Sequence, residues 1–145
     1  MLTIILLTKT NTNMNIARKR ILIIEDHESI RLLLGTMLSK TYEVVTKKDG
    51  LEGMAWLVKG NLPDLILLDM SMPRLSGNDF LKNIRQSGFF HDIPVIVVSG
   101  NDGEEDVKNC LRWGVDDYLT KPFNPISLKK RIESVLFQPQ PYVLN

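Results

Sequence analysis

The sequence predicts a doubly wound α/β domain built on a parallel sheet, and two observations lead to this fold class. First, short apolar runs alternate five times with segments of helical periodicity. Second, three of these runs, at 21–24, 65–68 and 95–98, are apolar at every position rather than at alternate ones. Continuous apolar strands are typical of parallel sheets that helices cover on both faces. A helix between each pair of strands supplies the right-handed crossovers that such a sheet needs.

Length and composition fit one globular domain. The chain has 145 residues, of which 43% are hydrophobic and 24% charged. Eighteen Lys and Arg face seventeen Asp and Glu, so the net charge of +1 lacks the basic excess of most nucleic-acid-binding domains. We therefore expect no direct binding to nucleic acid. The single cysteine, Cys110, excludes an internal disulfide and a cysteine-based metal site, which favours a reduced, cytoplasmic location.

Three segments divide the chain: a loose N-terminal extension at 1–17, a domain at 18–137 and an extended tail at 138–145. The extension begins with an almost wholly apolar run at 2–7, followed by a polar stretch at 8–15 that resembles a loop. That run is far shorter than the ~20 residues of a membrane-spanning helix and lacks the flanks of a secretory signal. We expect no membrane association, and the length leaves no room for a separate output domain.

The first half of the domain contains two strands and two helices. A strand at 21–24 precedes an amphipathic helix, and a second strand lies at 42–46. Asp49 is the predicted N-cap of the next helix because Glu52 follows three residues later. The inward-facing positions of the first helix are predicted to be Ile30, Leu33, Leu34, Met37 and Leu38. Those of the second helix are Leu51, Met54, Ala55 and Val58.

The second half contains three more strands, each followed by a helix. The third strand, 65–68, ends at Asp69, and Ser76 caps a helix that Gly88 is predicted to end. The fourth strand ends at Ser99. The fifth is Tyr118-Leu119. In the helix after the third strand, the inward positions are Gly77, Phe80, Leu81 and Ile84. In the helix after the fourth strand they are Val107, Cys110 and Leu111, and Gly114 is predicted to end this helix. Asn124-Pro125 opens the last helix, whose inward positions are Leu128, Ile132, Val135 and Leu136.

Polar residues gather where the predicted strands end. In the expected strand order 2-1-3-4-5, Glu25 and Asp26 follow a strand that neighbours the one ending at Asp69. Ser99 and Lys121 follow the next two strands of the sheet. Two like charges 4 Å apart repel by about 4 kcal/mol at an effective dielectric of about 20, so this acidic cluster requires a cation or protonation. Hard oxygen ligands of this kind suit Mg²⁺.

This set of side chains is suited to phosphoryl transfer. Asp69 is the predicted nucleophile and would form an acyl phosphate. Lys121 supplies a fixed positive charge, and the Ser99 hydroxyl supplies a hydrogen bond that forms only when the phosphoryl group is present.

Five motifs carry a family resemblance. They are Ile23-Ile24-Glu25-Asp26, the run Pro63 to Met70, Met72-Pro73 with Gly77, Val97-Val98-Ser99-Gly100, and the run Asp116 to Phe123. Residues 20–137 resemble the receiver domain of two-component response regulators. The resemblance implies a five-stranded flavodoxin-like (βα)5 fold, with Asp69 as phospho-acceptor and with Glu25, Asp26, Asp69 and the backbone carbonyl of Ser71 as ligands of Mg²⁺.

The resemblance also assigns roles to residues that would read out the phosphoryl group. Ser99 would be the switch hydroxyl, Lys121 the phosphoryl-contacting lysine and Tyr118 the switch aromatic, with Lys121-Pro122 commonly cis in the family. A histidine kinase or phosphotransfer protein would be the donor. The face at 102–137 would contact a separate protein target, or a second copy after phosphorylation. Beyond assisting its own phosphorylation and dephosphorylation, the chain is not expected to be an enzyme.

Two features depart from the commonest family pattern. The acidic pair is Glu-Asp rather than Asp-Asp, and Ser99 stands where Thr is frequent.

Three alternative functions would need other residues at this site. A phosphatase using Asp69 would commonly have an acid two residues later, where this chain has Ser71. A flavin-binding domain would need a phosphate loop where Glu25-Asp26-His27-Glu28 stands. A phosphorylation-independent pseudo-receiver usually lacks the acceptor, the acidic pair or the lysine, all of which are present.

Overall fold

Five parallel strands form one sheet in the order β2-β1-β3-β4-β5. The computed structural model describes residues 17–100 and 104–137, so nearly all of the predicted extension and the whole predicted tail lie outside it. The strands are β1 (Arg20–Ile24), β2 (Glu43–Lys47), β3 (Leu65–Leu68), β4 (Val95–Ser99) and β5 (Asp117–Thr120). The predicted fold class and strand order are confirmed.

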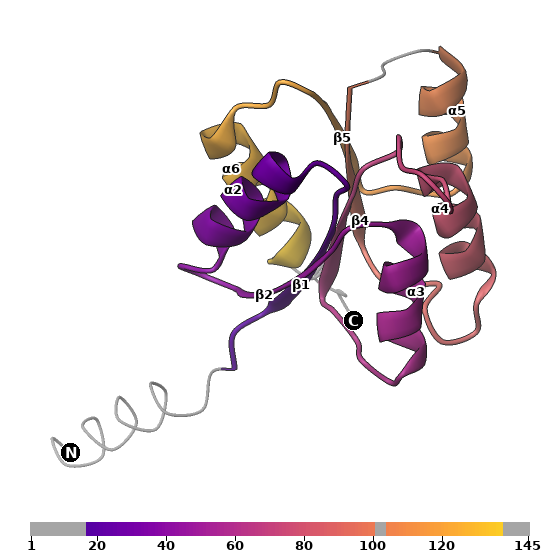
Figure 1. Ribbon diagram of the computed structural model, residues 1–145, viewed down its shortest axis with the longest axis horizontal. Coiled ribbons are helices and arrows are strands. Elements are labelled where there is room, and N and C mark those ends of the chain that lie inside the picture. The colour runs from indigo at the N-terminus through magenta and orange to yellow at the C-terminus, as the bar shows by residue number, and fades with distance from the viewer. Residues whose placement is uncertain (1–16, 101–103, 138–145) are drawn as a thin grey trace, which may run out of the picture.

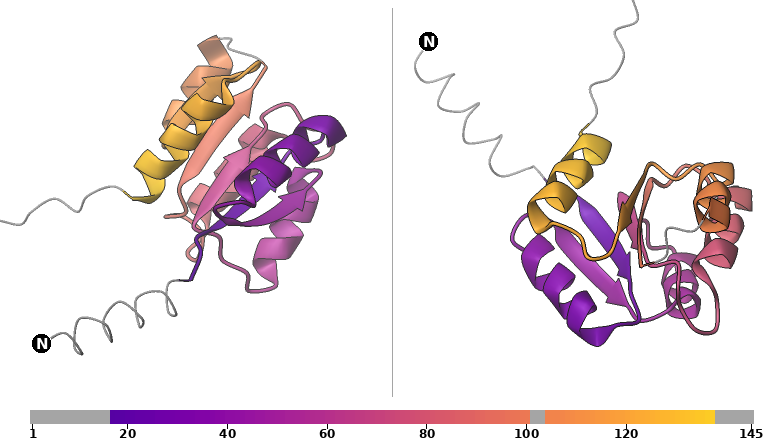
Figure 2. Two further views of the ribbon diagram at one scale, coloured as in Figure 1. Left: turned by 90° about the vertical axis from the view of Figure 1, so that its left-hand side faces the viewer. Right: turned by 90° about the horizontal axis from the view of Figure 1, so that it is seen from above.

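Helices cover both faces of the sheet. They are α2 (Glu28–Leu38), α3 (Gly50–Val58), α4 (Gly77–Gln86), α5 (Glu104–Arg112) and α6 (Pro125–Leu136). α2 and α6 lie on one face, and α3, α4 and α5 lie on the other (Figures 1 and 2). None of the helices within 17–100 and 104–137 is long and apolar enough to cross a membrane.

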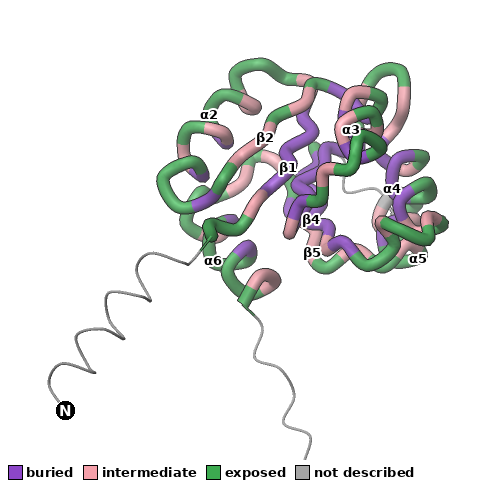
Figure 3. Tube along the Cα trace, turned by 90° about the horizontal axis from the view of Figure 1, so that it is seen from below, coloured by how far each residue is buried: buried purple, intermediate pink, exposed green. Residues whose placement is uncertain are grey.

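The core consists of two apolar clusters, one on each face of the sheet. Along β1, Leu22 and Ile24 pack into the cluster under α3, α4 and α5, while Ile21 and Ile23 pack into the cluster under α2 and α6. All four side chains are at most 1% exposed. This explains why the central strands are apolar at every position: each of their faces is buried (Figure 3).

Most predicted helix caps are observed. The Asp49 carboxylate accepts a hydrogen bond from the Glu52 backbone N–H at 2.9 Å, and the Asn124 side chain accepts from the first turn of α6. Ser76 caps α4, and Gly114 follows α5 with a positive φ of 64°. The prediction that Gly88 ends α4 is wrong. The helix already ends at Gln86, because the next residue, Ser87, is extended and its hydroxyl accepts hydrogen bonds from the N–H groups of Phe89 and Phe90.

The predicted inward face of α3 is wrong at Leu51, Ala55 and Val58, which are exposed, whereas Met54 packs against the core cluster as predicted. Leu51 and Val58 are 45% and 71% exposed, whereas Gly50, Gly53 and Leu57 are buried. A Cβ atom on Gly53 would lie 2.5 Å from the Ile24 Cδ1 atom. The helix therefore presents its small residues to the sheet and lies close to β1. The prediction assumed that large apolar residues make the contact between this helix and the sheet.

Two leucines predicted to face the core also point outward. Leu33 of α2 is 55% exposed and Leu111 of α5 is 70% exposed, while their neighbours Leu34 and Cys110 are buried. Adjacent residues on a helix point about 100° apart, so each apolar pair has one buried member.

Candidate functional site

The carboxyl ends of β1 and β3 bring the three predicted acidic residues together. The Asp69 N–H donates to the Ile24 carbonyl at 3.0 Å, which extends the pairing of the two strands to the acidic residue itself. One carboxylate oxygen from each of Glu25, Asp26 and Asp69 lies within 4.8 Å of the other two. The predicted acidic cluster is therefore present in the folded chain.

A hollow of about 330 Å³ opens beside this cluster. It is lined by Asp26, His27, Ile30, Asp69, Ser71, Gly100 and Lys121. Glu25 and Asp69 are only 2% and 3% exposed. Asp69 therefore faces a small opening from an otherwise buried position, where its carboxylate can meet a reactant from outside.

The Lys121 ammonium lies between two of the carboxylates. Its Nζ donates to both oxygens of Glu25, at 2.9 and 3.0 Å, and lies 3.6 Å from Asp69 Oδ2. The end of β4 fixes the backbone of the lysine, because the Lys121 N–H donates to the Ser99 carbonyl at 2.8 Å. The bond between Lys121 and Pro122 is cis, as the family resemblance implied.

The surroundings of Asp69 oppose its ionisation. Its pKa is raised from 3.8 to about 7, chiefly by burial and then by a hydrogen bond with the Asp26 carboxyl group and the negative charge of Glu25. The Ser71 N–H, 3.1 Å from Asp69 Oδ1, and the Lys121 ammonium act in the opposite direction. At neutral pH the protein alone supplies too little positive charge to keep Asp69 fully ionised.

The donor set fits a bound Mg²⁺ ion. Carboxylate oxygens are the hard ligands that this ion prefers, and three of them meet at the mouth of β1 and β3. The two members of the acidic pair, Glu25 and Asp26, differ in their contacts. Both oxygens of Glu25 accept hydrogen bonds from Lys121, whereas Asp26 lines the hollow together with Asp69. Ser71 also lines the hollow, and the role of its carbonyl as a ligand stays a prediction.

The two predicted switch residues lie on neighbouring strands. Ser99 ends β4 and is fully buried, and it is paired in register with Thr120 of β5. Tyr118, two residues earlier on β5, is half-buried and packs against the apolar cluster under α3, α4 and α5. Ser99 therefore lies beside the strand that carries Tyr118. Their switch roles stay predictions.

Arg31 was missed by sequence reasoning. Its guanidinium donates to the backbone carbonyls of Glu25 and Asp26 at 2.9 and 3.3 Å, and so holds the segment that carries both carboxylates. The signal available was a cation in the first turns of the helix that follows the acidic pair. His27 is the exposed N-cap residue of α2 and also lines the hollow.

Gly77 has a closer relation to the site than its predicted inward position suggested. A Cβ atom there would lie 2.5 Å from Met70 Cα and 2.9 Å from the Asp69 carbonyl oxygen. The Gly77 N–H also donates to the Met70 carbonyl. Only glycine lets the start of α4 approach the backbone that carries Asp69 so closely.

Comparison with known proteins agrees with this arrangement. A family model described as "Response regulator receiver domain" matches residues 21–133. The chain is 40% identical over 124 residues to "Probable transcriptional regulator ycf27" of Cyanophora paradoxa, covering 85% of this chain and 50% of that protein. The chain thus spans about half the length of the curated relatives that it matches.

Solved receiver structures share the fold. The phosphorylated cyanobacterial phytochrome response regulator RcpA is 32% identical with a TM-score of 0.76, covering 86% of this chain and 98% of that one. The receiver domain of the sensor histidine kinase PA1611 from Pseudomonas aeruginosa PAO1, with a magnesium ion coordinated in its active-site cleft, is 29% identical. Its TM-score is 0.75, and the match covers 83% of this chain and 98% of that one. The matched motifs, the strand order and the acidic cluster agree, and this chain belongs to the family of response regulator receiver domains.

Proposed function

We propose that this protein is a phosphorylation-dependent signalling receiver in which Asp69 accepts a phosphoryl group from a histidine kinase or phosphotransfer protein. One observation carries the proposal: Asp69 is a buried carboxylate that lines a small hollow, with the Lys121 ammonium 3.6 Å from its Oδ2 atom. A carboxylate and an ammonium group thus share one opening, which supports a role in in-line phosphoryl transfer.

In the proposed transfer, one bond to phosphorus forms and one breaks. An Asp69 carboxylate oxygen attacks the phosphorus of a donor phosphohistidine, the P–N bond breaks, and the departing imidazole takes up a proton from solvent. Lys121 is placed to neutralise charge on the phosphoryl oxygens, since its Nζ already faces both Glu25 and Asp69. Asp26, Asp69, Glu25 and the Ser71 carbonyl would hold Mg²⁺. When bound, the ion would supply positive charge to the carboxylates and to the phosphoryl oxygens.

Two relatives support this proposal through what is described of them. RcpA is a phosphorylated response regulator, and the PA1611 receiver holds magnesium in its cleft. The curated relatives are named as transcriptional regulators rather than as enzymes. We accordingly propose that the chain has no activity on a separate substrate and works in the cytoplasm.

The phosphorylation claim is tested by intact mass measurement after incubation with acetyl phosphate and Mg²⁺. Wild type is expected to gain one phosphoryl group, and Asp69→Asn none. Asp64→Asn is the matched control, because Asp64 lies at the opposite end of the same strand, where it accepts a hydrogen bond from the Arg20 N–H. Equal labelling of Asp69→Asn and wild type would contradict the assignment.

Readout is proposed to run through Ser99 and Tyr118. The phosphoryl group adds roughly −1.5 to −2 charge and new acceptor oxygens, so a Ser99 hydroxyl that bonds it in one state only biases a two-state equilibrium. Tyr118 would then turn inward and reshape the face at 102–137, which would bind a protein target or a second copy. This face includes β5 and α6 and the described part of α5.

Beryllofluoride with Mg²⁺, which mimics the phosphoryl group, tests this readout by NMR. The ring signals of Tyr118 and the amides of α5 and β5 are expected to shift, and light scattering reports any dimer. Shifts confined to the residues around the hollow would contradict the coupling and leave the phosphorylation claim standing.

A further inference from the structure

A second hollow, apolar and remote from Asp69, opens at the amino-terminal end of the sheet. It has a volume of about 270 Å³ and is lined by Leu57, Val58, Gly60, Leu62, Phe89 and Phe90. These residues come from the end of α3, the loop that leads to β3 and the loop that leads to β4. None of the described residues that line it is charged.

Three side chains around this hollow are unusually exposed for their type, whereas Leu57 at its base is buried. Val58 is 71% exposed, Leu62 58% and Phe89 87%. Exposed apolar surface of this kind is unfavourable in water, and where such side chains gather around a depression they mark a place where apolar groups bind. The occupant is therefore expected to be apolar and uncharged.

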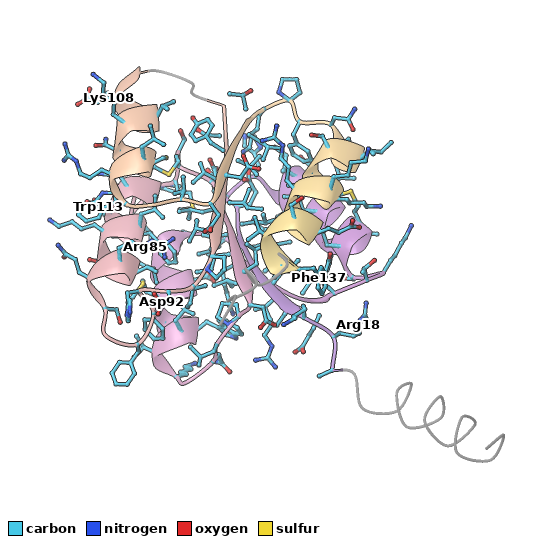
Figure 4. All side chains as sticks on the ribbon, turned by 180° about the vertical axis from the view of Figure 1, so that it is seen from behind. Arg18, Arg85, Asp92, Lys108, Trp113 and Phe137 are labelled. Atoms are coloured by element: carbon cyan, nitrogen blue, oxygen red, sulfur yellow. The ribbon has the colours of Figure 1, made fainter. Side chains whose placement is uncertain are left out.

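The start of β1 contacts residues that flank the lining of this hollow in the sequence. The Arg20 guanidinium lies 6.0 Å from the Trp56 ring centre, and the Arg20 N–H donates to Asp64 Oδ2 at 2.7 Å. Trp56 directly precedes Leu57, and Asp64 lies two residues after Leu62. Figure 4 shows Arg18 and Asp92, which belongs to the loop before β4, toward the same end of the molecule, away from Lys108.

We propose that residues 2–7 of the same chain bind in this apolar hollow. Their sequence, Leu-Thr-Ile-Ile-Leu-Leu, contains no charge and matches the hollow in character. The nine residues at 8–16 that join this segment to the domain span up to about 30 Å when extended, which is ample for a target flanked by residues that contact the start of β1. The described part of the chain ends at Phe137 after α6, on the opposite face of the sheet from α3, whereas Arg20 near its start lies against Trp56 of α3.

A spin label on the full chain tests this proposal directly. Cys110, the single cysteine, is 1% exposed, so a thiol-reactive nitroxide will attach selectively at Thr3→Cys. We expect strong paramagnetic broadening of the amide signals at 57–62 and 87–90. The amides at 31–36 serve as reference, because this stretch of α2 also exposes leucines, Leu32 and Leu33, but on the opposite face of the sheet.

Substitutions in the segment complete the test. Ile4→Ser, Ile5→Ser and Leu6→Ser together should abolish the selective broadening, whereas Thr10→Ser and Thr12→Ser in the polar joint should preserve it. Broadening no greater at 57–62 than at 31–36 would overturn the proposal, as would its persistence in the triple variant. A mixture of labelled chain and isotope-enriched unlabelled chain reports contacts between molecules. Broadening at 57–62 in that mixture would assign the hollow to a second copy instead and would also overturn the proposal.

Discussion

The Lys121 ammonium is bound more closely to Glu25 than to Asp69. Its Nζ lies 2.9 and 3.0 Å from the two oxygens of Glu25 and 3.6 Å from Asp69 Oδ2. Glu25 has one methylene more than the aspartate that is commoner at this place in the family, and its carboxylate binds Lys121 with both oxygens. Glu25 therefore holds the lysine in position, and Asp26 is the member of the acidic pair that faces the hollow.

Removing Lys121 should destabilise the protein through Glu25. In Lys121→Met the buried Glu25 carboxylate loses the partner of both its oxygens, and breaking such a pair costs about 3 kcal/mol. Urea unfolding measures the loss. The double variant Glu25→Gln with Lys121→Met should recover more than half of it. A single variant as stable as wild type would contradict the role of this pair.

The two members of the acidic pair should differ in their effect on Mg²⁺ affinity. Asp26→Asn is expected to weaken binding by roughly tenfold or more, since Asp26 lines the hollow with Asp69. Glu25→Gln should weaken it less, because both oxygens of Glu25 are already engaged by Lys121. Titration calorimetry gives both constants. A larger loss in Glu25→Gln would show that Glu25 is the principal ligand.

Without Mg²⁺, the contribution of Asp69 to the stability of the fold should fall as pH rises. The pKa of Asp69 is raised to about 7 by burial, above the 3.8 of an unperturbed aspartate, so the folded state binds the proton more tightly than the unfolded state does. This contribution is complete below about pH 4 and is lost as pH rises to about 7. Asp69→Asn should therefore exceed wild type in stability by about 1–3 kcal/mol at about pH 8 in EDTA.

Denaturant unfolding across this pH range checks the sign. The advantage of Asp69→Asn should shrink toward acid pH, and saturating Mg²⁺ should stabilise wild type more than the variant. An Asp69→Asn protein less stable than wild type at about pH 8 in EDTA would contradict the described electrostatics.

A methyl group at Gly77 should disturb the backbone that carries Asp69. A Cβ there would lie 2.5 Å from Met70 Cα, so Gly77→Ala is expected to lose about 1–3 kcal/mol of stability and to slow phosphorylation. Gly88→Ala is the matched control, because no heavy atom of the described residues, apart from its chain neighbours, lies within 4 Å of its added Cβ. Thermal unfolding compares the two. Equal effects would show that the close approach of α4 has no such consequence.

The fold was predictable because its central strands are buried on both faces. That burial makes 21–24, 65–68 and 95–98 apolar at every position, and the polar residues that follow them mark one edge of the sheet. The edge strands carried a weaker signal and were placed to within about two residues, since β2 and β5 are only partly buried.

The contacts that depend on close approach or on long side chains were not predictable. The rotation of α3 is set by Gly53 against Ile24, and periodicity among large apolar residues gives no sign of it. The sequence placed Glu25 beside the acceptor but did not show that Lys121 binds both its oxygens. Likewise, the contact of Arg31 with two backbone carbonyls leaves no hydrophobic pattern to detect.

The central claim, that Asp69 carries the phosphoryl group, is tested most directly by locating the label. The protein is phosphorylated with acetyl phosphate and Mg²⁺, the acyl phosphate is reduced with borohydride, and the reduced aspartate is located by peptide mass spectrometry. The modification is expected at Asp69, which lines the hollow with Lys121 beside it. Modification at Asp26 instead, with Asp69 unchanged, would contradict the account.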